Sequence, residues 1–165
     1  MIRAVLFDFD MTLIDSSDAL LSNINKMAEH FGRPSCTRAL LLECIGLNSD
    51  AFWEAIFSGF SDEHEAYYVS ECLPHEHEKM RAFDGSFECV RALKAAGIKV
   101  GCASNRNTPV RVLSMTGLAP LMDCIVGACD VEHPKPAPDV ILRGMELLGS
   151  APQETAYIGD TPIDV

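Results

Sequence analysis

The stretch that decides the fold of this chain is Ala4-Val5-Leu6-Phe7-Asp8-Phe9-Asp10-Met11-Thr12-Leu13-Ile14-Asp15. It opens with four apolar residues, a pattern typical of a short buried strand. Two carboxylates, Asp8 and Asp10, come next, so we expect them at the carboxyl end of that strand. Open parallel α/β sheets bind ligands at this edge. The stretch therefore predicts a metal or phosphate site, although an Asp-rich turn would give the same pattern.

The composition indicates a soluble globular protein. The chain has 165 residues, of which 48% are hydrophobic and 22% are charged. This length suits one domain, or a small core that carries an insertion. No apolar run approaches the ~20 residues of a membrane span, and the first residues lack a signal-peptide pattern. We therefore expect a cytoplasmic protein without a membrane partner. The seven cysteines form no Cys-x-x-Cys pair, which favours reduced thiols over disulfides or a zinc site.

The charge narrows the class of partner. Thirteen basic and 24 acidic residues give a net charge of −11. Such a chain repels phosphate backbones, so we expect no nucleic-acid partner. The same field opposes a small anionic substrate. A phosphorylated substrate would therefore need a local cation.

Two kinds of pattern divide the chain. After residue 83, short apolar runs at 98–103, 124–127 and 155–158 alternate with helical patterns, and Thr108-Pro109 has the order of a helix start. Strands that alternate with helices predict a parallel α/β sheet wound with helices. Residues 16–80 instead show helical spacing throughout, with candidate helix starts at Ser16, Ser35 and Ser49. We expect a core of residues 1–15 and 81–165, interrupted by a helical unit at 16–80.

Three features of the helical unit admit two interpretations each. Trp53 and the nearby phenylalanines are expected to form its core, with a ligand site as the alternative. The segment His75-Glu76-His77-Glu78 is interpreted as a solvated linker, with a metal cluster as the alternative. The loop at 45–48 either faces the site or is a plain turn between helices.

Polar residues follow the predicted strands of the core. Asp8 and Asp10 follow the first, Ser104 and Asn105 the second, and Asp160 and Asp164 the fourth, while Lys135 lies in the loop after the third. Right-handed crossovers bring these positions to one edge of the sheet. Carboxylates without His or Cys neighbours favour Mg²⁺, and a carboxylate can also accept a phosphoryl group covalently. Ser104, Lys135 and a metal would supply hydrogen bonds and positive charge for phosphoryl transfer.

Four motifs resemble those of the haloacid dehalogenase superfamily. They are, in order, Asp8-Phe9-Asp10-Met11-Thr12-Leu13, Ala103-Ser104-Asn105, Lys135-Pro136-Ala137-Pro138-Asp139 and Gly159-Asp160-Thr161-Pro162-Ile163-Asp164. The resemblance spans the whole chain and implies a Rossmann-like core. The helical insertion is similar to the cap domain of the phosphoglycolate phosphatase-like and β-phosphoglucomutase-like branch.

The resemblance implies a role for each motif residue. Asp8 would be the nucleophile and a ligand of Mg²⁺. Asp10 would protonate the leaving group and then activate water, while its main-chain carbonyl touches the metal. Ser104 and Asn105 would bind the phosphoryl group, and Lys135 would steady its charge. The acids of the last motif, Asp160 and Asp164, would complete the metal site. The true dehalogenases lack a second acid at the position of Asp10, so dehalogenation is not expected.

The chain departs from the family pattern in two places. Met11 stands where Gly is usual. Members of this branch are also usually longer, with a further strand and helix after the fourth motif, whereas this chain stops at Val165. We therefore expect a truncated core whose fourth strand is an exposed edge and whose metal site is weakened by a frayed end.

The resulting expectation is a Mg²⁺-dependent phosphatase that acts on a small phosphorylated metabolite, with phosphoglycolate as the first candidate. One alternative is a phosphomutase of the β-phosphoglucomutase type. Another is a truncated, catalytically silent protein. A homodimer through the exposed edge would be a further partner.

Overall fold

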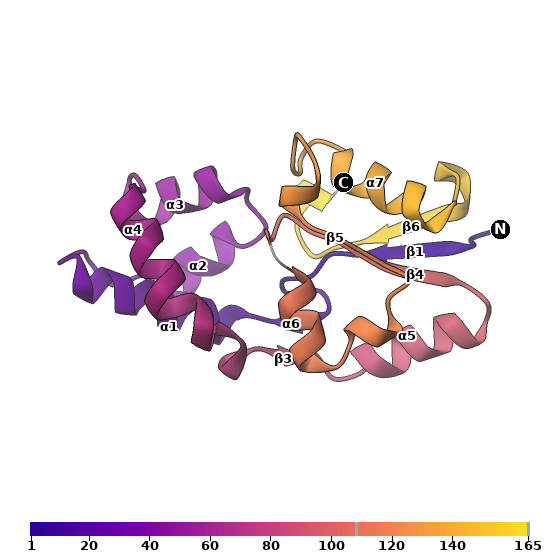
Figure 1. Cartoon of the computed structure of the whole chain (residues 1–165), viewed down its shortest axis with the longest axis horizontal. Helices are drawn as coiled ribbons and strands as arrows, with labels where there is room; N and C mark the ends of the chain where they lie inside the picture. Colours follow the sequence, from indigo (N-terminus) through magenta and orange to yellow (C-terminus); the bar gives the residue numbers. More distant parts are fainter. Residues whose placement is uncertain (108, 165) are drawn as a thin grey trace.

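The computed structural model describes residues 1–107 and 109–164 (Figure 1). Its main sheet has four parallel strands in the order β5-β4-β1-β6. Their bounds are β1 Ala4–Phe7, β4 Lys99–Ala103, β5 Cys124–Val126 and β6 Thr155–Ile158. The predicted parallel α/β sheet is therefore confirmed.

Helices cover both faces of this sheet because the side chains of its central strand alternate between them. Val5 and Phe7 pack in one cluster with Val90 of α5 (Ser86–Ala95) and Leu113 of α6 (Pro109–Thr116). On the opposite face Leu6 packs against α7 (Asp139–Leu148). Figure 1 shows α7 on one side of the strands and α5 and α6 on the other. The helix start predicted at Thr108 lies outside the described residues.

The register of the sheet sets the position of the motifs. Phe7, the last residue of β1, lies opposite Cys102 of β4 and Ile158 of β6. The residues that follow these three strands therefore leave the sheet at the same edge. They are the residues of three of the four motifs.

A helical unit, residues 17–79, separates β1 from the rest of the sheet. Its α-helices are α1 Ser17–His30, α2 Arg38–Cys44, α3 Ser49–Phe57 and α4 Asp62–Tyr67, followed by a π-helical turn at Tyr68–Cys72 and a 3₁₀ helix at Leu73–Lys79. The unit has its own buried cluster, which includes Met27, Leu41 and Trp53. The chain enters it through β2 (Ile14–Asp15) and leaves through β3 (Arg81–Ala82), and these two strands pair antiparallel. The two crossing points are thus tied together.

The backbone of Met11 explains one departure from the family pattern. Met11 has φ +61°, in the left-handed region that favours glycine, which explains why Gly is usual there. Its side chain packs against the cluster of the helical unit.

All seven cysteines are free, and five of them are buried. Among the described residues, none of the helices has the length and apolar character needed to cross a bilayer.

Candidate active site

Three carboxylates meet at the carboxyl edge of the sheet. Asp8 follows β1, Asp160 follows β6, and Asp164 lies in a 3₁₀ turn two residues from Pro162, its first residue. One carboxylate oxygen of each lies within 4.8 Å of the others. The convergence follows from pairing, since β1 and β6 are neighbours and the Asp8 N–H donates to the Ile158 carbonyl at 2.8 Å.

Lys135 reaches this cluster from the loop before α7. Its Nζ lies 2.9 Å from Asp8 Oδ1 and 2.6 Å from Asp164 Oδ1, and only 1% of the residue is exposed. It also donates to the hydroxyl of Tyr157 at 2.9 Å, and that hydroxyl donates to the Ala103 carbonyl at 2.8 Å. Burial raises the pKa of Tyr157, so the hydroxyl stays neutral. Tyr157 thereby helps to hold the Lys135 Nζ beside Asp8 and Asp164.

Sequence reasoning missed Tyr157 for a definable reason. It lies inside the apolar run that predicts β6, where a tyrosine counts as a packing residue. A buried tyrosine needs a partner for its hydroxyl, but nothing in the sequence says that this partner is Lys135.

The charge of the cluster leaves room for a cation. Burial raises the pKa of Asp8 to about 6, although Lys135 opposes the shift. Among the described residues, Asp8 Oδ1 has no hydrogen-bond partner; the contact with Lys135 is an ion pair by distance only. One ammonium group faces three carboxylates, which are hard oxygen ligands. The residues therefore fit a divalent cation such as Mg²⁺.

Ser104 and Asn105 follow β4 and lie beside Asp8, and both are buried. Ser104 Oγ accepts a hydrogen bond from the Arg106 N–H at 3.3 Å. The Asn105 amide donates to the Gly46 carbonyl at 3.0 Å and to the Lys135 carbonyl at 2.9 Å, and its oxygen accepts from the Lys135 N–H at 2.7 Å. These contacts make Asn105 a bridge between the lysine loop and the helical unit. Its side chain is already engaged in these bonds, and its predicted contact with phosphate stays a prediction.

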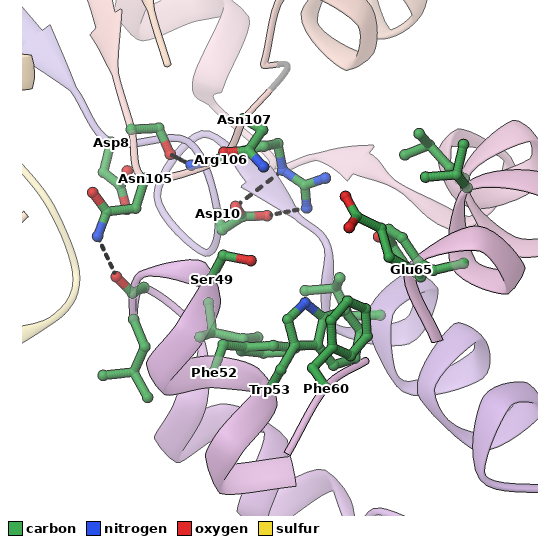
Figure 2. Close-up of a pocket in the computed structure, with 18 residues that line it drawn as sticks. Asp8, Asp10, Ser49, Phe52, Trp53, Phe60, Glu65, Asn105, Arg106 and Asn107 are labelled. Carbon is green, nitrogen blue, oxygen red and sulfur yellow. Dashed lines mark hydrogen bonds and ion pairs between the residues drawn. The ribbon is translucent and has the colours of Figure 1, made fainter. Parts of the chain in front are cut away.

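Asp10 is held by Arg106, a residue that sequence reasoning missed. The Nε and Nη2 groups of Arg106 donate to the Asp10 carboxylate at 3.1 and 2.8 Å (Figure 2). Its Nη1 donates to Glu76 at 2.9 Å, and Glu76 also accepts from the Tyr68 hydroxyl at 2.9 Å. Burial works against the charge of Arg106, but Asp10 and Glu76 outweigh it and raise its pKa. The network links Asp10 to the helical unit.

The prediction of a solvated linker at His75-Glu76-His77-Glu78 is wrong for Glu76. This residue is 2% exposed and lies in the 3₁₀ helix Leu73–Lys79. The buried carboxylate is tolerated because Arg106 compensates its charge. The only hint in the sequence is the position of Arg106, next to the Ala103-Ser104-Asn105 motif. No periodicity connects it to Glu76.

A cavity of about 330 Å³ lies between the sheet edge and the helical unit. Asp8, Asp10 and Ser104 are on its wall, as are Ile45, Gly46 and Leu47. The loop at 45–48 therefore faces the site, and the plain-turn interpretation is wrong. Figure 2 shows Asp8 and Asp10 on one side of the view and the aromatic side chains of Phe52, Trp53 and Phe60 on the other. The aromatic residues form a core, as expected, and also reach the cavity.

Comparison with known proteins agrees with this arrangement. A model of the family haloacid dehalogenase-like hydrolase matches residues 5–165. Pyrophosphatase PpaX of Bacillus mycoides (strain KBAB4) is 30% identical over 166 residues, which cover 99% of this chain and 77% of that protein.

Solved structures show the same fold. A protein described as a haloacid dehalogenase-like hydrolase, from Bacteroides fragilis, aligns with a TM-score of 0.89 and 26% identity, over 99% of this chain and 81% of that one. A predicted phosphoglycolate phosphatase from Haemophilus somnus 129pt aligns with a TM-score of 0.88 and 21% identity, over 99% and 79%. The family match, together with the converging motif residues, confirms the resemblance, and the chain belongs to the haloacid dehalogenase-like hydrolases.

Proposed function

We propose that this chain is a Mg²⁺-dependent phosphatase that hydrolyses a small phosphorylated metabolite through a phosphoryl group on Asp8. The observation that carries the proposal is the convergence of Asp8, Asp160 and Asp164 around buried Lys135, with Asp8 also on the wall of the cavity. Carboxylates grouped with a lysine and a neighbouring hydroxyl suit phosphoryl transfer. A substrate anion could enter this acidic protein because Lys135 and a bound Mg²⁺ would supply positive charge at the site.

Asp8, Asp160 and Asp164 would hold Mg²⁺, with the main-chain carbonyl of Asp10 as a further ligand. The ion would supply positive charge for the phosphoryl oxygens and for Asp8. Lys135 adds one positive charge 2.9 Å from Asp8 Oδ1, and Ser104 adds a hydroxyl donor.

The protein groups divide the reaction into two steps. In the first, an oxygen of Asp8 forms a bond to phosphorus while the bond from phosphorus to the ester oxygen breaks, and Asp10 gives its proton to that oxygen. In the second, water attacks the phosphoryl group on Asp8, Asp10 takes the proton of the water, and phosphate leaves. Arg106 contacts both oxygens of the Asp10 carboxylate and so orients its ionised form, which takes the proton of the water.

The helical unit would act as a cap. It contributes the Gly46 carbonyl to the hydrogen bonds of Asn105 and several apolar residues to the cavity. Such a cover excludes water that would compete with the substrate and selects the leaving group.

Hydrolysis of p-nitrophenyl phosphate and phosphoglycolate, with and without Mg²⁺, tests the proposal. We expect turnover that requires the metal and is lost in Asp8→Asn. The control is Asp84→Asn, which removes an exposed carboxylate from the turn before α5. No turnover by folded protein would contradict the proposal and favour a catalytically silent family member. Conversion of a hexose 1-phosphate to its 6-phosphate would instead favour a phosphomutase.

Two further properties are part of the proposal. Seven free cysteines suit the reducing cytoplasm. The outer edge of β6, where Ile158 is 43% exposed, could pair with a second copy. A mass from light scattering separates monomer from dimer.

A further inference from the structure

The cavity has two chemically different halves. The sheet edge contributes Asp8, Asp10, Ser104 and Asn105, whereas the helical unit contributes an aromatic wall of Phe52, Trp53, Phe60 and Tyr68. Leu20 and Leu73 extend this wall. The polar half has the groups that phosphoryl transfer needs. The aromatic wall must therefore face the rest of the substrate, which is the leaving group.

The aromatic wall is a rigid packed surface. Trp53 stacks on Phe60 with ring centres 4.3 Å apart and on Phe57 at 5.8 Å. Phe52 and Tyr68 meet Trp53 edge-on, at 5.0 and 5.4 Å. All of these rings except Phe57 line the cavity, so aromatic surface faces it. Aromatic rings pack well against another ring, either edge to face or offset-stacked.

The charges of the cavity disfavour a second anion on the substrate. Among the described residues that line it, Arg106 is the one cation, and Asp8, Asp10 and Glu65 are anionic. The guanidinium of Arg106 is already paired with Asp10 and Glu76. A carboxylate or second phosphate in the leaving group would meet no free cation there. This holds for phosphoglycolate and for pyrophosphate alike.

We propose that the natural substrate is a phosphomonoester whose alcohol part carries one uncharged, apolar ring. This inference rests on the proposed phosphatase function and names its substrate class. The ring packs against the aromatic wall, while the phosphoryl group lies at Asp8. A cavity of about 330 Å³ is near the lower limit for small-molecule sites, which suits a phosphoryl group and one ring.

Benzyl phosphate is a suitable probe of this class. Its bond from phosphorus to the benzyl oxygen breaks as Asp8 binds phosphorus. The oxygen keeps the electron pair, takes the proton of Asp10 and leaves as benzyl alcohol. Ethyl phosphate and phosphoglycolate also release aliphatic alcohols, so the comparison tests recognition of the ring and not the ease of bond cleavage.

The first experiment measures kcat/KM for benzyl phosphate, ethyl phosphate, phosphoglycolate, pyrophosphate and phosphocholine with Mg²⁺. We expect benzyl phosphate to exceed each of the others at least tenfold. If phosphoglycolate, pyrophosphate or the cationic phosphocholine equals or exceeds it, the inference is wrong while the phosphatase proposal stands. If none of the five is hydrolysed, the phosphatase proposal itself fails.

A matched pair of variants tests the aromatic wall directly. Phe60→Leu replaces a ring that lines the cavity by a smaller aliphatic side chain. Phe57→Leu makes the same change in the same aromatic cluster, at a residue that does not line the cavity. We expect Phe60→Leu to lower the ratio of kcat/KM for benzyl over ethyl phosphate at least threefold, and Phe57→Leu to keep the ratio. Equal ratios in both variants, with circular dichroism showing both folded, would contradict the inference. If a variant does not fold, the substrate series with the parent protein still decides.

Discussion

Replacing Asp8 by Asn should stabilise the metal-free protein at neutral pH, although it removes the proposed nucleophile. Burial raises the pKa of Asp8 from 3.8 to about 6 in the folded chain. The folded state therefore holds the proton more tightly than the unfolded state, and ionised Asp8 opposes folding above that pH. At about 1.4 kcal/mol per pKa unit, the full cost is about 3 kcal/mol.

The sign gives the shape of the expected pH profile. The cost of Asp8 is absent well below pH 3.8, grows between 3.8 and 6, and is complete above 6. Asn cannot ionise, so the free energy of unfolding of the variant should exceed that of the parent. The expected difference is about 1 kcal/mol at pH 4.5 and about 3 kcal/mol at pH 7.5. Carboxylates far from Asp8 titrate in both proteins and cancel in the difference.

The assay is urea denaturation of both proteins in EDTA, from pH 4.5 to 7.5, followed by circular dichroism. Asp84→Asn is the control and should show no widening gap. Added Mg²⁺ should stabilise the parent more than Asp8→Asn, since the variant lacks one proposed ligand. A gap that stays constant with pH, or a variant less stable than the parent at pH 7.5, would refute the reasoning.

Three further predictions concern residues around the site. Arg106→Met leaves Glu76 buried without its cation and should lower the free energy of unfolding by about 3–5 kcal/mol. Adding Glu76→Gln should recover most of this loss in urea denaturation. No recovery would count against the ion pair between Arg106 and Glu76. Tyr157→Phe removes the hydroxyl between Lys135 and Ala103 and should lower the free energy of unfolding by about 1 kcal/mol, measured by urea denaturation. It should also lower kcat. An unchanged kcat would contradict a positioning role for Tyr157. Gly46 has φ +94°, and Gly46→Ala would place a Cβ 3.3 Å from the Thr161 side chain. We therefore expect a higher KM for p-nitrophenyl phosphate. An unchanged KM would show that the loop at 45–48 does not close on the core.

The sheet and the clustering of the motif residues were predictable because each depends on short, local patterns. Short, largely apolar runs mark β1 and β6, and an acid follows each within two residues. Parallel pairing then brings Asp8 and Asp160 together without further information. The edge of a parallel sheet is the one place where distant polar residues meet by topology alone.

Helix starts were less predictable because several residues can fill the same cap. Ser35 and Thr37 are both good cap types, and the structure uses Thr37, whose side chain accepts from the Leu40 N–H. Asn48, one residue before the predicted Ser49, caps α3. Tertiary packing decides between such neighbours, and the sequence alone does not show it.

Contacts between the helical unit and the core were not predictable. Arg106 and Glu76 lie 30 residues apart and are brought together by how the helical unit packs on the sheet. Nothing in the pattern around His75 distinguishes a buried Glu76 from an exposed one. The ion pair between Arg106 and Glu76 therefore depends on the three-dimensional packing and not on a local pattern.

The central claim is that Asp8 carries the phosphoryl group and Asp10 moves the protons, and the Asp10→Asn variant tests it most directly. p-Nitrophenolate leaves without a proton donor, so this variant should still transfer the phosphoryl group but should fail to activate water. We predict a burst of about one p-nitrophenolate per protein chain with Mg²⁺, and mass spectrometry of the quenched protein should place the phosphoryl group on Asp8. Steady turnover with no phosphoryl group on Asp8 would contradict the account.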